Sequence, residues 1–505
     1  MAEMINEIFP SFKKFKEIGQ CNQLIFKKII ADKETPVSIF EKVCSSQNNC
    51  FLLESVTGGE NKARYSIIGM KPDLIWESLG NNCKIADNLR EGRKPKFRKL
   101  NTESLVELEK TIDRCKIDIP IGLPPMVAGL FGYVSYDVIR LIENLPNTNK
   151  DALGVPDIRL IRPTVLIVLD SIKNELIVAS PAWANDKKSL RETYDISVKL
   201  IEQTVMQVAL PRKKAKKKKI PKSYLGRPVS NFTKTAYLNI ISKAKNYIKS
   251  GDIFQVVPSQ RWKMKYLLPG LSLYRSLRRT NPSPYMFYFD FNDFSIIGSS
   301  PEILVKVEND KDVTIRPIAG TRPRGLNESQ DKALEKELLN DEKELAEHLM
   351  LLDLGRNDIG RVSEVGSVKI TESFVIERYS HVMHIVSNVK GKLSKGINNI
   401  TALLSGLPAG TVSGAPKIRA MEIIDELESE KRGIFGGGVG YFGTSGHMDF
   451  CIAIRTAILK DQNLYLQAGG GVVFDSDAET EFQETVNKSK ALLKAAQDSI
   501  HFFGD

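Results

Sequence analysis

The stretch MFYFDFNDFSIIGSSPEILVKV, residues 286–307, decides the class of fold. It contains three short runs rich in aromatic and β-branched residues, 286–291, 294–297 and 303–307, which predict strands. A long charged, amphipathic stretch, residues 329–352, then predicts a helix. Because strands follow one another without a helix between them, the pattern indicates an α+β fold rather than a doubly wound sheet.

The rest of the chain extends this pattern. In the first half, strand-like runs at 51–53, 65–68, 164–169 and 176–179 mix irregularly with an amphipathic stretch at 102–115. In the second half we predict two further helices, at 234–250 with Gly251 as its C-cap and at 479–497. Further strands are predicted at 253–257 and, as one strand DFCIAIRTAIL, at 449–459. The glycine-rich segments FGGGVGYFG at 435–443 and AGGGVV at 468–473 predict turns.

A basic segment divides the 505-residue chain. Seven of the net +11 charges lie in RKKAKKKK, residues 212–219, which prolines flank on both sides, so the run is typical of a solvated linker. We therefore predict an N-terminal domain at 1–210, a basic linker at 211–228 and a C-terminal domain at 229–505. A nucleic-acid or anionic-surface binding protein is the non-enzyme alternative, but no aromatic residues alternate with the lysines to stack on bases.

The bulk composition indicates a globular cytoplasmic protein. Hydrophobic residues make up 42% and charged residues 26%, no apolar run is long enough to span a bilayer, and the first residues lack the apolar region of a signal peptide. The six cysteines show no metal-binding or nucleophile spacing and are interpreted as packing residues in a reducing compartment; they are Cys21, Cys44, Cys50, Cys83, Cys115 and Cys451.

Two predicted helices carry carboxylates at helical spacing. Glu344 and Glu347 share one face of the first helix, and Glu481, Glu484 and Lys488 share one side of the last. Carboxylates from two helices that meet at a cleft would suit Mg²⁺. Taken alone, either pair is more simply a solvated helix face.

Other residues indicate an anionic ligand. The glycines Gly469, Gly470 and Gly471 allow backbone N–H groups to approach a ligand, although tight turns explain them equally well. Arg455 lies within an apolar run and requires a carboxylate partner, which is either a ligand or a structural salt bridge. The loop PAGTVSGAPK adds the hydroxyl of Thr411. Together these features suggest a small dianionic substrate and a metal.

Eleven segments of the second half, in order, resemble the chorismate-utilising enzymes. They are GDIFQVVPSQR, NPSPYMFY, GSSPEIL, RPIAGTRPRG, AEHLMLLDLGRND, SHVMHIVS, LPAGTVSGAPK, RGIFGGGVGYF, DFCIAIR, QAGGGVV and ETVNKSKAL. In the first half, LLES and ARYSIIG resemble the N-terminal domain of anthranilate synthase component I. The resemblance implies two α+β domains with large, mostly antiparallel sheets and an active site in the C-terminal domain.

The resemblance also implies roles for individual residues. Glu347 and Glu484 resemble the family's Mg²⁺ ligands, with Glu344 and Glu481 supporting them. The substrate-binding positions are Gly320, Thr321, Phe435, Arg455, Gly469, Gly470, Gly471 and Lys488. The catalytic positions are Glu302, His384 and Thr411, with Glu302 as the acid that protonates the leaving hydroxyl and His384 as the histidine implicated in turnover.

Two positions indicate which reaction within the family the chain performs. Isochorismate and salicylate synthases resemble this chain but place a lysine base where it has Gln255, and aminodeoxychorismate synthases place a lysine where it has Ala319. Both differences favour anthranilate synthase, which makes anthranilate and pyruvate from chorismate and ammonia; the sister synthases remain the alternatives. Phe435 and Gly470 depart from the usual tyrosine and alanine.

The resemblance finally implies partners. Since the chain lacks a GxCxG nucleophile turn, a separate glutamine amidotransferase subunit would supply ammonia. The segments LLES and NPSPYMF resemble a pocket for feedback inhibition by L-tryptophan. A buried strand end and a proline turn are the alternative, but because both motifs match together the resemblance favours inhibition. The residues of this predicted pocket are Glu54, Ser55, Pro284, Tyr285 and Met286.

Overall fold

The structure is a computed structural model. It describes residues 6–45, 47–55, 64–87, 89, 94–184, 188–211, 223–308, 311–379 and 382–503. The lysine run at 212–219 lies outside the described residues, so the linker and the division of the sequence around it stay predictions.

The strands are mostly short, and two of them, β4 and β8, are long. In chain order they are β1 (Ile8–Phe9), β2 (Gln23–Ile30), β3 (Cys50–Glu54), β4 (Tyr65–Leu79), β5 (Asn82–Asp87), β6 (Arg98–Lys99), β7 (Gly129–Val134), β8 (Ile158–Asp170), β9 (Glu175–Ala182), β10 (Val229–Ser230), β11 (Gln255–Val256), β12 (Ser259–Lys265), β13 (Tyr285–Asp290), β14 (Phe294–Ser300), β15 (Ile303–Glu308), β16 (Asp312–Ile315), β17 (Ile318–Pro323), β18 (Lys369–Arg378), β19 (Val382–Lys392), β20 (Gly414–Ala415), β21 (Gly438–Gly443), β22 (Met448–Ile452), β23 (Thr456–Lys460) and β24 (Asn463–Gly469).

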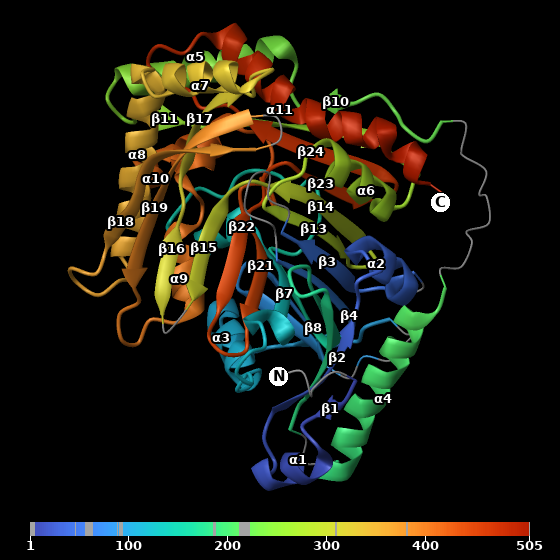
Figure 1. Ribbon diagram of the computed structural model, residues 1–505. Coiled ribbons are helices and arrows are strands. Elements are labelled where there is room, and N and C mark those ends of the chain that lie inside the picture. Colours follow the sequence, from blue (N-terminus) through green and yellow to red (C-terminus); the bar gives the residue numbers. More distant parts are fainter. Residues whose placement is uncertain are drawn as a thin grey trace.

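The helices cover the strands from outside. They are α1 (Phe12–Ile18), α2 (Pro36–Cys44), α3 (Ser104–Arg114), α4 (Leu190–Ala209), α5 (Lys234–Lys249), α6 (Gly270–Thr280), α7 (Glu328–Leu338), α8 (Glu342–Gly360), α9 (Asn399–Gly406), α10 (Lys417–Leu427) and α11 (Ala478–Asp498), with 3₁₀ turns η2 (Pro125–Val127), η3 (Tyr136–Leu141), η4 (Gly410–Val412) and η5 (Ser499–Phe502). Figure 1 shows α5, α7, α8 and α11 around the strands of the second half and α4 at the opposite end, near β1 and β2.

Strands from both halves of the sequence join in one sheet. Among the described residues, 22 strands are connected by hydrogen-bonded pairs, and β11 with β20 forms a separate two-stranded ladder. The pairing of β3 with β13 and of β7 with β21 joins the two halves, and both pairs are antiparallel. The α+β class with a large antiparallel sheet is confirmed.

Glycines permit close backbone contacts on either side of the β7–β21 pair, between β21 and β22 and between β7 and β8. Gly132 lies opposite Gly440 in this pair. A Cβ on Gly440 would lie 1.9 Å from the carbonyl oxygen of Asp449, and a Cβ on Gly132 would lie 2.0 Å from that of Arg159. Only glycine therefore allows these neighbouring backbones to approach so closely.

Three sequence predictions of element boundaries are wrong. The long helix expected at 329–352 is two helices, α7 and α8, because the Asp341 side chain accepts hydrogen bonds from the N–H groups of Lys343 and Glu344 and starts a new helix. The single strand expected at 449–459 is broken between β22 and β23, where Arg455 has a φ of 51°. Ser250, rather than Gly251, is the C-cap of α5, and Gly251 follows it with a φ of 82°.

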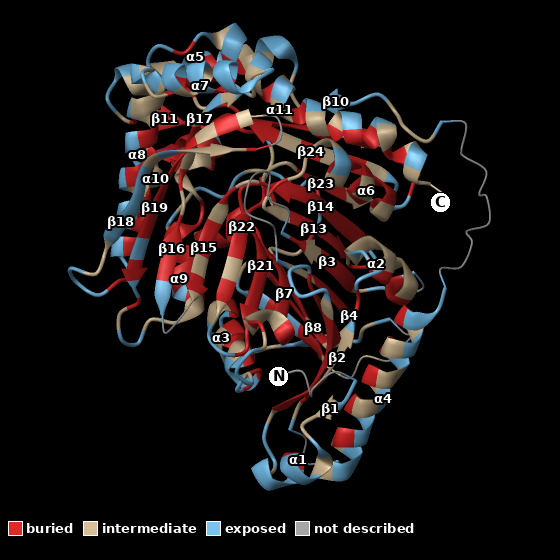
Figure 2. Cartoon of the chain, viewed as in Figure 1, coloured by how far each residue is buried: buried red, intermediate tan, exposed pale blue. Residues whose placement is uncertain are grey.

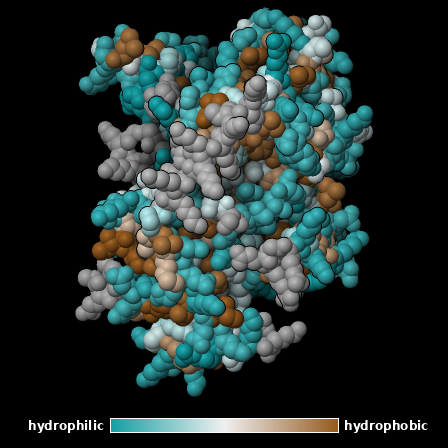
Figure 3. All heavy atoms as spheres, turned by 90° about the vertical axis from the view of Figure 1, so that its right-hand side faces the viewer, coloured by the Kyte–Doolittle hydropathy of each residue, from teal (hydrophilic) through white to brown (hydrophobic). Residues whose placement is uncertain are grey.

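The buried residues lie along the strands, while the helices present exposed outer faces (Figure 2). All six cysteines are free thiols, and the five buried ones are confirmed as packing residues, whereas Cys21 is exposed and that interpretation is wrong for it. On the face shown in Figure 3, hydrophobic residues form separate patches among hydrophilic ones. In the described part of the chain, no helix is both long and apolar enough to cross a membrane.

A buried ion pair, Glu428 with Arg432, links the segments that carry the candidate site. The Arg432 Nε lies 3.0 Å from Glu428 Oε2, and both side chains are under 5% exposed. The guanidinium also donates to the carbonyl oxygens of Val412 (2.5 Å) and Val257 (2.6 Å). Glu428 accepts in turn from the backbone N–H of Ser259 at 2.8 Å. The pair therefore connects the turn η4 to the chain between β11 and β12.

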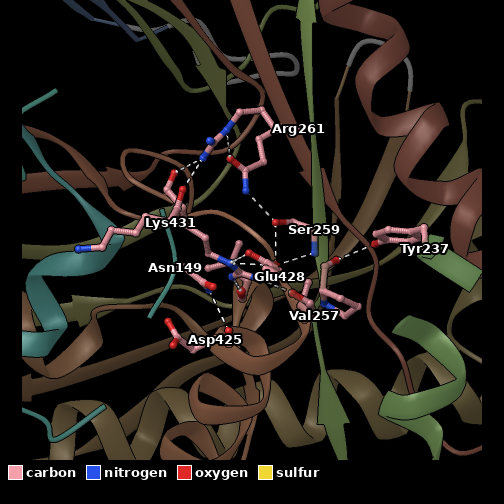
Figure 4. Close-up of polar contacts among 12 residues, drawn as sticks. Asn149, Tyr237, Val257, Ser259, Arg261, Asp425, Glu428 and Lys431 are labelled. Atoms are coloured by element: carbon pink, nitrogen blue, oxygen red, sulfur yellow. Dashed lines mark hydrogen bonds and ion pairs between the residues drawn. The ribbon is translucent and has the colours of Figure 1, made fainter. Parts of the chain in front are cut away.

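The same region also holds residues of the first half (Figure 4). Asn149 donates to the carbonyl oxygen of Asp425 at 2.8 Å, and Arg261 donates to that of Lys431 at 2.6 Å. Gln467 accepts from Arg261 at 2.9 Å and donates to Ser259 Oγ at 2.8 Å, so it links Arg261 to Ser259. This buried network fixes segments that are far apart in the sequence.

We predict that Arg432→Met destabilises the protein strongly, because it leaves the Glu428 carboxylate buried without its counter-charge. The free energy of unfolding should fall by about 3–5 kcal/mol. Urea denaturation of the variant measures this change through its midpoint.

The matched control is Arg98→Met, which removes the pair between Arg98 and Asp87, where both side chains are over 40% exposed. Its cost should be at most about 1 kcal/mol. Equal losses in the two variants would contradict the role of the buried pair.

Candidate active site

A carboxyl group and a hydroxyl form the first part of the site. Glu302 follows β14, and the Thr411 hydroxyl in η4 lies 3.2 Å from each of its carboxylate oxygens. Burial raises the pKa of Glu302 to about 8, although Thr411, a backbone hydrogen bond from Ile318 and the charge of Lys488 oppose that rise. Glu302 is therefore mostly protonated at neutral pH and can donate a proton.

His384 lies on β19 with one ring nitrogen already engaged. Its Nδ1 lies 2.8 Å from the carbonyl oxygen of Gly320, so that nitrogen carries the hydrogen and Nε2 has a free lone pair. The Thr321 hydroxyl lies 3.1 Å from the same Nδ1. Burial lowers the pKa of His384, and the nearby Arg455 charge lowers it further. A neutral imidazole can accept a proton through Nε2.

Two cations lie beside these groups. The Arg455 guanidinium donates to the carbonyl oxygen of Lys488 at 2.8 Å, which is the one hydrogen bond of this side chain within the described residues. Lys488 Nζ lies 2.6 Å from Glu484 and 3.1 Å from the carbonyl oxygen of Gly469. Of the two carboxylate partners that the sequence allowed for Arg455, the structural salt bridge does not form within the described residues, since the guanidinium bonds to a backbone carbonyl. Its remaining donors suit an anionic ligand.

The carboxylates of α8 form one acidic pair. Glu347 accepts a hydrogen bond from the Gln255 side chain at 3.2 Å, and Glu344 lies 3.5 Å from Arg322. Burial raises the pKa of Glu344, and the charge of Glu347 raises it further. Like charges are thus held close together on this helix.

The carboxylates of α11 form a second acidic pair. Glu481 accepts from the Ser476 hydroxyl at 2.7 Å, while its other oxygen, Oε2, is buried and has no hydrogen-bond partner. Burial raises the pKa of Glu481, and the charge of Glu484 adds to this effect. An unpartnered buried carboxylate oxygen is costly unless a cation or a proton joins it.

The glycine turn lies between the two acidic pairs. A Cβ on Gly471 would lie 3.9 Å from Glu347 Oε1, and a Cβ on Gly470 would lie 3.4 Å from Glu481 Oε2. No group of three or more His, Cys, Asp or Glu side chains in the described ranges forms a complete metal cage. Mg²⁺ usually takes only one or two protein carboxylates and completes its shell with water and substrate oxygens, so the donors present fit it.

These residues form one connected arrangement, which we call the polar ring. Each member lies in contact with another member, adjoins one in sequence, or contributes a charge that shifts the pKa of another. The ring consists of Glu302, Thr411, Lys488, Glu484, Arg455, His384, Thr321, Gly320, Glu344, Glu347, Gln255, Gly471, Gly470, Gly469 and Glu481. The structure thus brings together the predicted catalytic, metal and substrate positions other than Phe435.

Phe435 lies outside the contacts of the polar ring. Its aromatic ring faces the Arg432 guanidinium at 5.6 Å, and it lines a small separate cavity with Arg261 and Gln467. Its assignment as a substrate-binding residue stays a prediction.

Sequence reasoning missed the residues that hold the carboxylates in place. They are Gln255 for Glu347, Arg322 for Glu344 and Ser476 for Glu481. Gln255 had a detectable signal, since it is a polar residue beside the apolar pair Val256 and Val257, but its partner is 92 residues away in sequence.

All five predicted tryptophan-site residues line one cavity of about 900 Å³. Ser55 and Met286 lie on its wall, and the Tyr285 hydroxyl donates to Asp449 at 3.1 Å. Glu54 is also in the lining, but its buried carboxylate accepts hydrogen bonds from Arg278, at 2.8 and 3.1 Å, and from Tyr274. Glu54 is therefore engaged within the protein, whereas Ser55 is exposed to the cavity.

Burial raises the pKa of Asp449 to about 6, against the opposing charge of Lys306 and the hydrogen bond from Tyr285. The sequence analysis did not identify Asp449 as part of this cavity.

The chain resembles known proteins over nearly its full length. It is 54% identical over 492 residues to the anthranilate synthase component 1 of Cereibacter sphaeroides, covering 97% of each chain. It is 47% identical to the protein of the same name from Pseudomonas putida, covering 96% of this chain and 97% of the relative.

Solved structures agree with these relatives. The anthranilate synthase component I of Streptococcus pneumoniae superposes with a TM-score of 0.75 at 36% identity, covering 92% of this chain and 98% of that one. The menaquinone-specific isochorismate synthase of Escherichia coli, at 18% identity and a TM-score of 0.69, shares the fold. A family model described as chorismate binding enzyme matches residues 49–494, and the chain belongs to this family.

Proposed function

We propose that this chain is the large subunit of an anthranilate synthase, which converts chorismate and ammonia to anthranilate and pyruvate in tryptophan biosynthesis. The observation that carries the proposal is the buried Glu302, a carboxyl group with a pKa of about 8 that shares the polar ring with two cations and two acidic pairs. The identity to the component 1 relatives supports it over the whole chain.

Glu302 supplies the proton that the first step requires. Ammonia adds at C2 of the chorismate ring, and the double bonds shift as the C4 hydroxyl leaves. Hydroxide is a poor leaving group, so Glu302 protonates it and water departs. The Thr411 hydroxyl then stabilises the carboxylate that remains, because it donates to both oxygens.

His384 accepts a proton in the second step. Removal of the C2 proton and release of the enolpyruvyl group, which becomes pyruvate on protonation, leave the aromatic ring of anthranilate. The lone pair on Nε2 is available because Nδ1 donates to Gly320. Arg455 and Lys488 bind the substrate's carboxylates, together with the N–H groups of the glycine turn.

A magnesium ion would neutralise the ring carboxylate of chorismate and hold it in place. Glu347 and Glu484 would bind the ion, and Glu344 and Glu481 would support them. The unpartnered Oε2 of Glu481 and the like-charge effects on both helices support this placement.

Gln255 and Ala319 support this reaction over those of the sister synthases. An enzyme that adds water needs a base to activate it, and Gln255 is instead a neutral amide whose nitrogen donates to Glu347. Ala319 offers no nucleophile. Ammonia requires neither group. A partner amidotransferase subunit would release it from glutamine.

The cavity of about 900 Å³ supports feedback inhibition by L-tryptophan. It combines aromatic and apolar walls with polar groups, as expected for an amphipathic amino acid. Because Glu54 is bound to Arg278, we assign recognition of the ligand's polar groups chiefly to Ser55.

The first prediction from this function concerns metal and activity. Purified protein with chorismate, Mg²⁺ and an ammonium salt should produce anthranilate fluorescence, and Glu347→Gln and Glu484→Gln should each lower it by about 100-fold or more because a ligand to the ion is lost. Glutamine in place of ammonium should give no signal.

Glu342→Gln is the matched control, since Glu342 lies on the same helix but is exposed. It should retain activity. Formation of aminodeoxychorismate, isochorismate or salicylate as the product would contradict the assignment.

The second prediction concerns pH. The rate of anthranilate formation, divided by the concentration of unprotonated ammonia, should be constant below a pH of about 8. Above that pH it should fall, because Glu302 loses its proton. Thr411→Val removes a hydrogen bond that stabilises the ionised form, so the pKa of Glu302 rises and the fall should move to higher pH by about one unit.

Stopped assays across the pH range measure this shift. Thr280→Val is the control, because the Thr280 hydroxyl bonds to the carbonyl oxygen of Ser276 within α6. A fall at the same pH in Thr411→Val and the wild type would argue against Glu302 as the acid.

The third prediction concerns inhibition. Ser55→Ala should raise the tryptophan concentration for half-inhibition by about tenfold, the effect of one lost hydrogen bond of about 1.4 kcal/mol. Ser242→Ala on the surface of α5 should leave inhibition intact. A Ser55 variant with full sensitivity would remove this residue from the pocket.

A further inference from the structure

One wall of the large cavity is also a wall of the polar ring. Pro301, Ile318 and Tyr379 line the cavity. Pro301 directly precedes Glu302, and the backbone of Ile318 forms a hydrogen bond to the Glu302 carboxylate. A single residue, Pro301 or Ile318, therefore lies between the cavity and Glu302 of the polar ring.

Tyr379 contacts the catalytic histidine through this wall. Its ring lies edge-on to His384, with the centroids 5.5 Å apart and the planes at 65°. Tyr379 is 9% exposed, so its ring has little freedom to move without displacing its neighbours.

The other side of Tyr379 is held by charged residues of the cavity. Its hydroxyl donates to Glu377 at 2.9 Å, and Glu377 forms an ion pair with Arg316 at 2.6 Å. The carbonyl oxygen of Tyr379 accepts from Arg324 at 2.8 Å. Glu377, Arg316 and Arg324 all line the cavity, so a charged ligand there would act on the groups that hold Tyr379.

We propose that Tyr379 is a positioning residue that couples occupancy of the cavity to the orientation of His384. The proposal rests on the proposed inhibition by tryptophan and names the residues through which the bound ligand would act on His384. A ligand that displaces Glu377 or Arg316 moves the Tyr379 hydroxyl, and the ring then changes its packing against His384. The hydrogen bond from His384 to Gly320 has a narrow geometry, so a small rotation weakens it.

The test compares binding with inhibition in Tyr379→Phe, which keeps the ring and removes the hydroxyl. Calorimetry measures tryptophan binding, and the ammonia-dependent assay measures the rate left at saturating tryptophan, relative to each protein's own uninhibited rate. We expect the dissociation constant to stay within about twofold and the residual rate to rise by about fivefold or more, the lower range of allosteric couplings. Glu377→Gln should behave in the same way.

Tyr65→Phe is the matched control, because Tyr65 lines the same cavity but its ring lies beside Arg64. In this control, any change in the tryptophan dissociation constant should appear equally in the concentration for half-inhibition, and the residual rate at saturating tryptophan should match that of the wild type. If Tyr379→Phe binds tryptophan and is inhibited as fully as the wild type, the coupling is overturned. If the wild-type protein binds no tryptophan, that result contradicts the proposed inhibition itself rather than the role of Tyr379.

A measurement on the wild type makes the test independent of how the variants fold. The chain has five histidines, so NMR of the ¹⁵N-labelled imidazoles can follow His384, assigned through His384→Gln. Tryptophan should shift the His384 signals. Saturation with tryptophan that leaves them unchanged would overturn the proposal.

Discussion

The buried ion pair between Glu428 and Arg432 is the interaction on which the candidate active site depends. Arg432 donates to the carbonyl oxygens of Val412 and Val257, so one guanidinium holds the turn that carries Thr411 and the chain that follows Gln255. Burial of two charges is costly, and the pair is stable only because hydrogen bonds satisfy both partners. A neutral residue at either position would leave these segments without a common anchor.

Within this frame, burial places similar carboxyl groups in different electrostatic environments. Burial raises the pKa of Glu302 to about 8, which suits the proton donor that we propose. Glu344 and Glu481 instead lie beside like charges from Glu347 and Glu484, an arrangement that a divalent cation would relieve. Under the proposed function, the same residue type would serve acid catalysis in one environment and metal binding in the other.

The interleaving of the two halves places the large cavity, where we propose that tryptophan binds, close to the candidate active site. Because β3 pairs with β13, the segment with Ser55 lies beside the segment with Tyr285, and the cavity between them extends to Tyr379. Tyr379 in turn contacts His384. A ligand in the cavity is therefore one side chain away from the polar ring.

The sequence by itself determined the α+β class, most of the strands and helices and the residue types of the site, because local periodicity and long motifs carry that information. It could not determine where α7 ends and α8 begins, because that boundary depends on the hydrogen bonds of the Asp341 cap. Nor could it determine that the strand is broken at Arg455. Only the tertiary structure decided that Glu54 is bound to Arg278 and that Gln255 holds Glu347. Such contacts join residues far apart in the chain, and the pKa values of the buried groups depend on that packing rather than on neighbours in sequence.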